Sequence, residues 1–376
     1  MKIETVSVRS IVTNRDGLHN YFGWPTVARL KDGRLAVVAS GFRYYHKCPF
    51  GKDIISFSPD EGKTWSLPAI TFDTPLDDRD SGVVPFGESG VLVSSCNCGA
   101  DSRVFMDGCD KLPKVGAYIA AYLDLMREET DLADYEGSLY RLSYDNGHTF
   151  GEIRHMPVSN PHGPVALDDG SFLWVGNAID HGLIPEISCW KLYQDGTYEK
   201  LSDIAPVEGY ASFEPYATVL KDGTVLVHIR VENSTSNEKY FTIFQSESHD
   251  GGKSFTVPHS IGLTTTSGAP AHILQDGDTL ISVYAHRNEP HELRAAFSFD
   301  GGCTWDGDHV IASLPDPHAD FGYPSSVVLK DGSILTVFYG GDDESDNTTF
   351  WAGKDTPIYT FPTPVVRQVI WRYEKD

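Results

Sequence analysis

The sequence lacks a long apolar run, an excess of basic residues and a low-complexity linker. No hydrophobic segment approaches the roughly 18 residues of a membrane-spanning helix, so we expect no membrane span. The 30 Lys and Arg residues are outnumbered by 53 Asp and Glu residues, which gives a formal net charge of −23. A surface this acidic repels phosphate backbones and anionic headgroups, so neither nucleic acid nor a membrane is an expected partner.

Cysteine is also scarce, with six residues among 376. Cys96, Cys98 and Cys109 lie close together, but their C-x-C spacing has no matching second half, so we predict no metal site and no cofactor. The N-terminus lacks the apolar core of a signal peptide, which predicts a cytoplasmic protein, or a secreted one if a leader precedes the sequence given. Because no linker divides the chain, 1–376 is predicted to form a single domain.

A repeated turn motif is the first positive signal. The pattern Ser-x-Asp-x-Gly-x-Thr/Ser-aromatic occurs four times, beginning at Ser58, Ser143, Ser248 and Ser298. In such a segment Asp accepts hydrogen bonds from its own turn, Gly supplies a positive φ, and the aromatic ring anchors the turn on a sheet. The four segments are therefore predicted to be structural hairpin tips.

A second repeat is interleaved with the first. Apolar strand-like runs flank an Asp-Gly dipeptide or a near variant at six glycines: Gly33, Gly90, Gly170, Gly223, Gly277 and Gly332. The last four are separated by 53, 54 and 55 residues, whereas 80 residues separate Gly90 from Gly170 and leave room for an insertion. Within that interval, residues 115–130 have the pattern of a helix.

Together the two repeats predict the fold. Two hairpins make a four-stranded sheet of about 50 residues, the size of a propeller blade, and six such units predict an all-β, six-bladed β-propeller with a short helical insertion near residues 115–130. The first strand-like run, 4–12, and the last, 365–374, are expected to share one blade and close the ring.

In a propeller, residues that begin the innermost strands surround the mouth of the central channel. Five of the six expected inner strands carry a proline near their start, and the second offers Arg79-Asp80 instead. The residues before the prolines are Trp24, His162 with Gly163, Glu214, Ala269 and Tyr323. The following strands return to the same face and end near Arg43, Asn97, Asn177, Arg230, Arg287 and Tyr339. Such a ring fits a polar ligand, including an anionic one.

At this point the sequence resembles the sialidase superfamily, whose Asp-boxes match the four turn motifs. The segment FEPYATVLKDGTVLVHIR looks like the family segment in which a Glu activates the nucleophile and an Arg sixteen residues later binds a carboxylate, which would be Glu214 and Arg230. The segment DFGYPSS resembles that of the nucleophilic Tyr, here Tyr323. The segment HELRAAFSFDGGCTW puts Arg294 forward as a further carboxylate ligand, with Arg287 as its competitor.

The sequence departs from the family at two places. Sialidases carry an Arg two residues before the first-blade Pro, where this chain has Gly23, so Arg43 or Arg79 would have to substitute. The usual acid/base Asp has no obvious counterpart in the loop of residues 41–53, which offers His46 or Asp53. Asp80 at the second-blade mouth is the alternative proton donor.

The resemblance implies retaining hydrolysis of a terminal, acidic sugar, with carbohydrate as the partner. Tyr323 would be the nucleophile and Glu214 its base, while Asp80 or Asp53 would protonate the leaving oxygen. Trp24 and His162 are candidate sugar contacts. Packing explains Trp24 equally well, and a histidine such as His162 is more often structural than catalytic.

Three alternatives remain open from the sequence. An exo-glycosidase for a non-sialic sugar would use Glu214 and Asp80 as an ordinary carboxylate pair. A uronate polysaccharide lyase would use Tyr323, His162 and Arg230. A carbohydrate-binding propeller without catalysis would need no Glu–Tyr pair.

Overall fold

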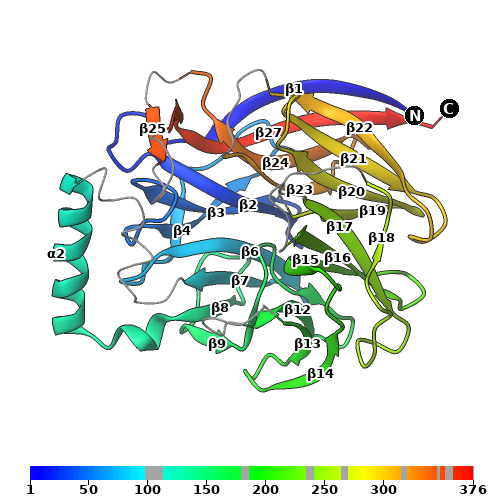
Figure 1. Cartoon of the computed structure of the whole chain (residues 1–376), viewed down its shortest axis with the longest axis horizontal. Coiled ribbons are helices and arrows are strands. Elements are labelled where there is room, and N and C mark those ends of the chain that lie inside the picture. Colours follow the sequence, from blue (N-terminus) through cyan, green and yellow to red (C-terminus); the bar gives the residue numbers. More distant parts are fainter. Residues whose placement is uncertain are drawn as a thin grey trace.

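The computed structural model describes residues 1–97, 113–178, 186–233, 241–263, 270–314, 320–344, 348–351 and 359–375. Within these ranges six antiparallel sheets are arranged as the blades of a propeller, which confirms the predicted fold (Figure 1). In each blade the first strand lies at the channel and the last at the rim.

From the channel outward, the first three blades have the following strands. Blade 1 contains β2 (Tyr21–Arg29), β3 (Leu35–Arg43), β4 (Lys52–Ser58) and β5 (Ala69–Phe72). Blade 2 contains β6 (Asp78–Phe86), β7 (Gly90–Asn97), β8 (Gly137–Ser143) and β9 (Arg154–Met156). Blade 3 contains β10 (Val158–Ser159) and β11 (Val165–Ala166), both paired with β12 (Phe172–Ala178), then β13 (Ile187–Leu192) and β14 (Tyr198–Ile204).

The other three blades follow the same order. Blade 4 contains β15 (Tyr210–Val219), β16 (Val225–Asn233), β17 (Phe241–Ser248) and β18 (His259–Ser260). Blade 5 contains β19 (His272–Asp276), β20 (Thr279–His286), β21 (Glu292–Ser298) and β22 (Asp306–Ser313). Blade 6 contains β23 (Gly322–Val328), β24 (Ile334–Gly341), β27 (Pro364–Glu374) and β1 (Lys2–Val12). A separate hairpin of β25 (Thr348–Trp351) and β26 (Tyr359–Pro362) lies between β24 and β27 in the chain.

The two ends of the chain close the ring, as the sequence predicts. Strand β1 pairs antiparallel with β27, with Val8 opposite Val369, and thereby becomes the outermost strand of blade 6. The two termini consequently lie side by side (Figure 1).

The Asp-boxes connect the third and fourth strands of blades 1, 2, 4 and 5, at the rim of the propeller. In the first of them Asp60 accepts hydrogen bonds from the Thr64 amide at 2.8 Å and from the Thr64 hydroxyl at 2.7 Å. The amide of Gly62, which has a φ of 78°, donates to the Ser58 hydroxyl at 2.8 Å. The same contacts recur at Asp145, Asp250 and Asp300. These carboxylates are therefore engaged within their own turns.

The predicted helical insertion is also present. Helix α2 (Pro113–Glu129) follows β7 and is continued by a short 3₁₀ helix, Leu132–Tyr135, before β8. It stands at one side of the ring (Figure 1). Ile119 and Leu123 are buried there beside Tyr45 and Phe50 of the loop between β3 and β4. None of the described helices is long and apolar enough to cross a membrane.

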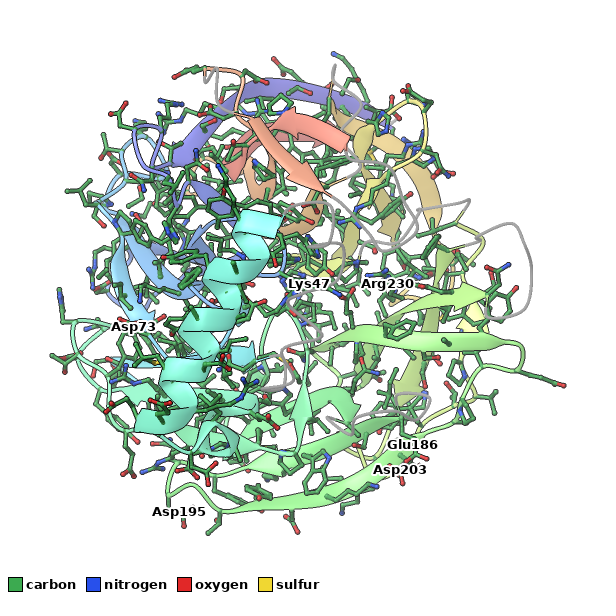
Figure 2. The ribbon with its side chains drawn as sticks, turned by 60° about the vertical axis from the view of Figure 1, so that its left-hand side comes forward. Lys47, Asp73, Glu186, Asp195, Asp203 and Arg230 are labelled. Atoms are coloured by element: carbon green, nitrogen blue, oxygen red, sulfur yellow. The ribbon has the colours of Figure 1, made fainter. Side chains whose placement is uncertain are left out.

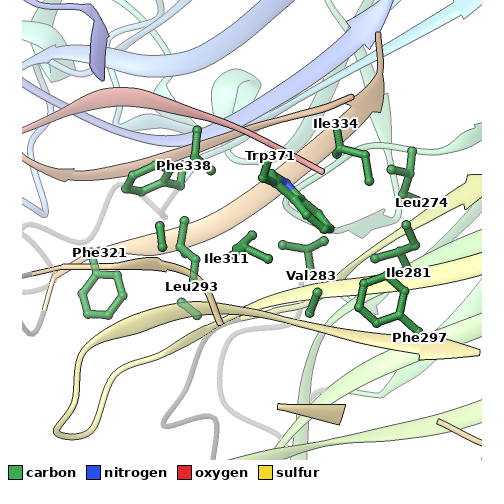
Figure 3. Close-up of a cluster of buried hydrophobic side chains, with 14 residues drawn as sticks. Leu274, Ile281, Val283, Leu293, Phe297, Ile311, Phe321, Ile334, Phe338 and Trp371 are labelled. Atoms are coloured by element: carbon green, nitrogen blue, oxygen red, sulfur yellow. The ribbon is translucent and has the colours of Figure 1, made fainter. Parts of the chain in front are cut away.

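Apolar side chains between neighbouring blades form the core. The cluster between blades 5 and 6 surrounds Trp371, which is fully buried beside Phe297 and Phe338 (Figure 3). The Trp371 indole N–H donates to the Thr336 hydroxyl at 2.9 Å, so its one polar atom is satisfied.

Because Trp371 fills the space between two blades, we predict that Trp371→Ala lowers the free energy of unfolding by about 3–5 kcal/mol. Chemical denaturation measures the loss. The control is Val310→Ala on β22, whose side chain is 39% exposed and whose replacement should change stability by less than about 0.5 kcal/mol. Equal stability of the two variants would contradict this account of the core.

Candidate active site

Four inner strands begin with the same unusual backbone. Trp24, Asp80, Glu214 and Tyr323 have φ values of 53°, 55°, 47° and 51°, in the left-handed region that L residues rarely adopt. At each of them the pairing with the next strand is interrupted by a register shift. Blade 3 has Gly163 in the corresponding place with a φ of 80°, and Ala269 of blade 5 lies outside the described residues.

This repeated bulge sets the direction of four side chains, of which those of Asp80, Glu214 and Tyr323 come together at the channel mouth. A bulge leaves a residue unpaired in the ladder and re-aims its side chain. A left-handed non-glycine residue costs on the order of 1–3 kcal/mol, and such strain gathers at functional sites. Arg230 projects onto the centre of the ring in Figure 2, whereas Asp195 and Asp203 of blade 3 lie at its rim.

The centre of the site is a hydrogen-bonded chain from Tyr323 through Glu214 to Arg230. The Tyr323 hydroxyl donates to Glu214 Oε1 at 2.5 Å, and Arg230 Nη1 donates to Glu214 Oε2 at 2.6 Å. The second nitrogen of the guanidinium, Nη2, contacts Glu232, and the Glu214 amide donates to Asn177 Oδ1 at 2.7 Å. The structure thus brings together three residues that are 109 and 16 positions apart in the sequence.

The surroundings keep Tyr323 protonated at rest. Burial raises the pKa of its hydroxyl well above 10, and the Glu214 carboxylate raises it further. The charges of Arg230 and Arg287 oppose this rise and would favour the phenolate once the proton leaves.

Asp80 faces the same group of charges from blade 2. Burial raises its pKa to about 6, with Glu214 adding to the rise and Arg79 opposing it. Its Oδ2 lies 3.6 Å from Arg79 Nε, and its side chain is 21% exposed. Asp80 is therefore a partly exposed carboxyl group that is protonated at mildly acidic pH.

Of the two competing arginines of blade 5, Arg287 lies beside Tyr323, whereas Arg294 is paired elsewhere. Arg287 Nε donates to the Phe321 carbonyl at 2.6 Å and Nη2 to the Tyr339 hydroxyl at 3.1 Å, with its guanidinium 5.8 Å from the centre of the Tyr323 ring. Arg294 lies on β21, the third strand of blade 5 counted from the channel, and is paired with Glu292 at 2.8 Å and Asp308 at 3.3 Å.

Arg43 and Arg79 both lie over the ring of Trp24, at 4.8 and 4.3 Å from its centre. Arg43 is fully buried and paired with Asp77 at 2.5 Å, so it holds the loop in place. Arg79 keeps 12% of its side chain exposed beside Asp80 and is the one of the two that borders the mouth.

The two candidate sugar contacts, Trp24 and His162, are buried below the mouth. Trp24 is 1% exposed and is enclosed by Tyr21, Tyr323 and Tyr339, so its ring supports its neighbours and presents no face to a sugar. His162 is 2% exposed and lies between Thr26, at 3.0 Å, and the rings of Tyr216 and His272. Burial, followed by the charge of His272, lowers the pKa of His162 well below its usual value.

Sequence reasoning missed the buried carboxylate of Asp320. It accepts hydrogen bonds from the hydroxyls of Tyr21 and Tyr339 and lies 3.2 Å from His46 Nδ1. The sequence signal that could have pointed to Asp320 was its position three residues before Tyr323 and next to an aromatic residue. Asp53, by contrast, is wholly buried on β4 and cannot serve as the proton donor to a ligand.

No three His, Cys, Asp or Glu side chains among the described residues could hold a metal ion. Cys96 lies at the end of β7, while Cys98 and Cys109 fall outside the described residues.

Comparison with known proteins places the chain in a family. The model of the BNR repeat-like domain matches residues 126–336, more than half of the chain. No curated protein sequence matches it.

Solved structures share the fold. A protein of unknown function from Dyadobacter fermentans is similar over 99% of both chains, with 18% identity and a TM-score of 0.71. The NanB sialidase of Streptococcus pneumoniae is 14% identical over 96% of this chain and 70% of its own, with a TM-score of 0.61. The α-L-arabinanase of Penicillium chrysogenum is 14% identical over 98% of both chains, with a TM-score of 0.62.

At such identities these likenesses establish the architecture, which agrees with the four Asp-boxes and the six blades. The chain therefore belongs to the BNR repeat-like domain family, and its fold is a six-bladed β-propeller that it shares with these solved structures.

Proposed function

We propose that the protein is a retaining glycoside hydrolase that removes a terminal, acidic sugar. The observation that carries the proposal is the 2.5 Å hydrogen bond from the Tyr323 hydroxyl to Glu214, whose other oxygen binds Arg230. A phenol needs an adjacent base to become a nucleophile, and Glu214 is such a base. A non-catalytic sugar-binding propeller would have no need of this arrangement.

In the first step the Tyr323 oxygen bonds to the anomeric carbon while its proton passes to Glu214. Asp80 donates a proton to the glycosidic oxygen, so the aglycone leaves as a neutral alcohol. A neutral nucleophile suits an anomeric carbon that carries a carboxylate, because an aspartate in its place would be repelled. In the second step a water oxygen bonds to the anomeric carbon and its proton passes to the Asp80 carboxylate, while the bond to Tyr323 breaks and Tyr323 recovers its proton from Glu214.

Three guanidinium groups support an acidic substrate. Arg230 and Arg287 flank Tyr323, and Arg79 lies across Asp80 on the ring of Trp24. Arg79 compensates for the missing first-blade arginine. A Cβ added at Gly23 would lie 3.3 Å from the Tyr21 ring and 3.6 Å from that of Tyr339, so aromatic side chains fill the space there.

A glycosidase for a neutral sugar is the second candidate. It is favoured by the raised pKa of Asp80 beside Glu214, which is the environment of an acid in a carboxylate pair, and by the likeness to an arabinanase. A panel of aryl glycosides with acidic and neutral sugars separates the two. The lyase alternative has no support, because His162 lies buried below the mouth.

We predict that Glu214→Gln and Tyr323→Phe each reduce kcat by at least about a thousandfold, because the nucleophile loses its base or its oxygen. The measurement is steady-state turnover of the best aryl glycoside of the panel. Thermal unfolding should change little, since each replacement keeps the shape of the side chain.

The matched control is Glu232→Gln, which contacts the same guanidinium but not Tyr323. It should raise KM and leave kcat within about tenfold, since it removes only a support of Arg230. Full activity in either Glu214→Gln or Tyr323→Phe would refute the mechanism.

Because the pKa of Asp80 is raised to about 6, the proton donor is present below pH 6 and is lost as the pH rises through that value. We predict that kcat/KM falls above pH 6, and that Asp80→Asn removes this alkaline limb together with most activity on substrates with poor leaving groups. Aryl substrates whose leaving group needs no proton should retain turnover. A wild-type limb that persists unchanged in Asp80→Asn would assign it to another group.

A further inference from the structure

Helix α2 has two apolar faces, of which one is packed against the rest of the protein. Ile119 and Leu123 lie on the packed face, where they are buried beside the loop between β3 and β4. The opposite face consists of exposed side chains: Ala117, Tyr118, Ala121 and Leu125. Tyr118 and Leu125 are each 51% exposed, and the helix stands outside the blades (Figure 1). Because the outer side of a surface helix is normally polar, this second apolar face indicates a docking surface.

The exposed face ends in two residues of opposite charge. Lys114 lies one turn before Ala117, and Glu128 lies one turn after Leu125, with both charged residues exposed. The positions 114, 117, 121, 125 and 128 follow one another at intervals of 3, 4, 4 and 3, which places them on one side of a helix. These intervals are the same when read from either end, and Ala121 is at their centre.

Such a face matches a second copy of itself in antiparallel orientation. A two-fold axis through Ala121 brings Lys114 opposite the partner's Glu128, and the same contact is then made a second time by symmetry. The axis also brings Leu125 opposite the partner's Ala117, so a large side chain meets a small one. In a parallel pair each charge would instead face its like. The face is therefore complementary to itself in charge and in size when the two helices are antiparallel.

The size of this surface sets the strength of the contact. Ala121 at the centre allows the two helix axes to approach to about 8 Å. Tyr118 widens the surface on one side, since its ring stacks on Phe50 with ring centres 4.6 Å apart. A helix of 17 residues is nevertheless only about 25 Å long, and a single pair of such helices buries less than the roughly 1,200 Å² of a standard interface. The contact therefore fits a weak, reversible dimer.

We propose that two copies of the protein associate through α2, in a symmetric antiparallel pair centred on Ala121. Each copy carries a formal net charge of −23, so two copies repel each other at most orientations. The paired Lys114 and Glu128 contacts make α2 a place where this repulsion is locally reversed. The association is independent of the proposed function, because α2 contributes no side chain to the chemistry at the channel mouth.

Sedimentation of the full chain over a concentration series tests the association. The wild type should pass from monomer to dimer with a dissociation constant in the micromolar range. Ala121→Glu should raise that constant by at least about a hundredfold, since it places two carboxylates side by side on the two-fold axis. Glutamate is a good helix former and Ala121 is exposed, so thermal unfolding of the monomer should be unchanged.

Charge reversal tests the pairing. Lys114→Glu and Glu128→Lys should each weaken the dimer by about tenfold or more, because like charges then meet twice. The double variant Lys114→Glu/Glu128→Lys should recover the wild-type affinity, and so should an equimolar mixture of the two single variants. Both replacements suit the helix dipole, so neither weakens α2 itself.

The matched control is Lys221→Glu, which makes the same change in net charge at an exposed turn of blade 4. It should leave the dimer unchanged. An equal weakening by Lys221→Glu would assign the effect to general repulsion and would overturn the pairing of Lys114 with Glu128.

Cross-linking tests the register. Under a mild oxidant, Ala121→Cys should form a disulfide-linked dimer, because the two positions meet on the axis. Leu125→Cys should not, since its copy would lie about 12 Å away along the helix, beyond the reach of a disulfide. The wild type, with its exposed Cys303, gives the background.

Three outcomes would overturn the proposal. The first is a wild type that stays monomeric throughout the concentration series, and the second is a dimer that survives Ala121→Glu. The third is failure of both the double variant and the mixture to recover the affinity lost in the single variants. None of these outcomes bears on the glycosidase proposal, which is tested by turnover.

Discussion

Pairing of β1 with β27 is the constraint on which the site depends. It places the N-terminal strand on the outside of the last blade and brings blade 6 against blade 1. Tyr323 heads the inner strand of blade 6, while Trp24 heads that of blade 1, and their rings meet across this junction. Without closure, the Tyr21, Trp24 and Tyr339 rings that enclose Tyr323 would have no common space. The most distant parts of the sequence therefore build one wall of the mouth.

The second determinant is a backbone conformation repeated around the ring. Trp24, Asp80, Glu214 and Tyr323 occupy the same bulge in four blades, yet each environment gives its side chain a different task. Burial and the nearby Glu214 carboxylate raise the pKa values of Tyr323 and Asp80, whereas Glu214 is held by a guanidinium on one side and the Tyr323 hydroxyl on the other. A repeated backbone conformation thus places four side chains in different electrostatic surroundings, because each blade contributes a different neighbour.

The arginines show how a site can be rebuilt on an unchanged fold. Blade 1 has Gly23 at the position of the expected arginine, and a Cβ added there would meet the Tyr21 and Tyr339 rings. Trp24 supports Arg79 of blade 2 instead, by a contact that is stronger when it is desolvated. Under the proposed function, Arg79 of blade 2 would therefore bind the acid group of the substrate in place of a first-blade arginine.

The sequence by itself determined the number of blades, the hairpin positions, the helical insertion and the closure of the ring, because turn chemistry and strand patterns are local and repeat along the chain. It also brought Glu214, Arg230 and Tyr323 to one mouth, since residues at equivalent places in a repeat must meet at the axis. Only the tertiary structure decided that Arg79 borders the site while Arg43 and Arg294 are bound elsewhere, and that Asp320 lies behind His46. Those outcomes depend on which side chain of another blade fills each space and neutralises each charge. A local sequence pattern contains no information about such contacts between blades.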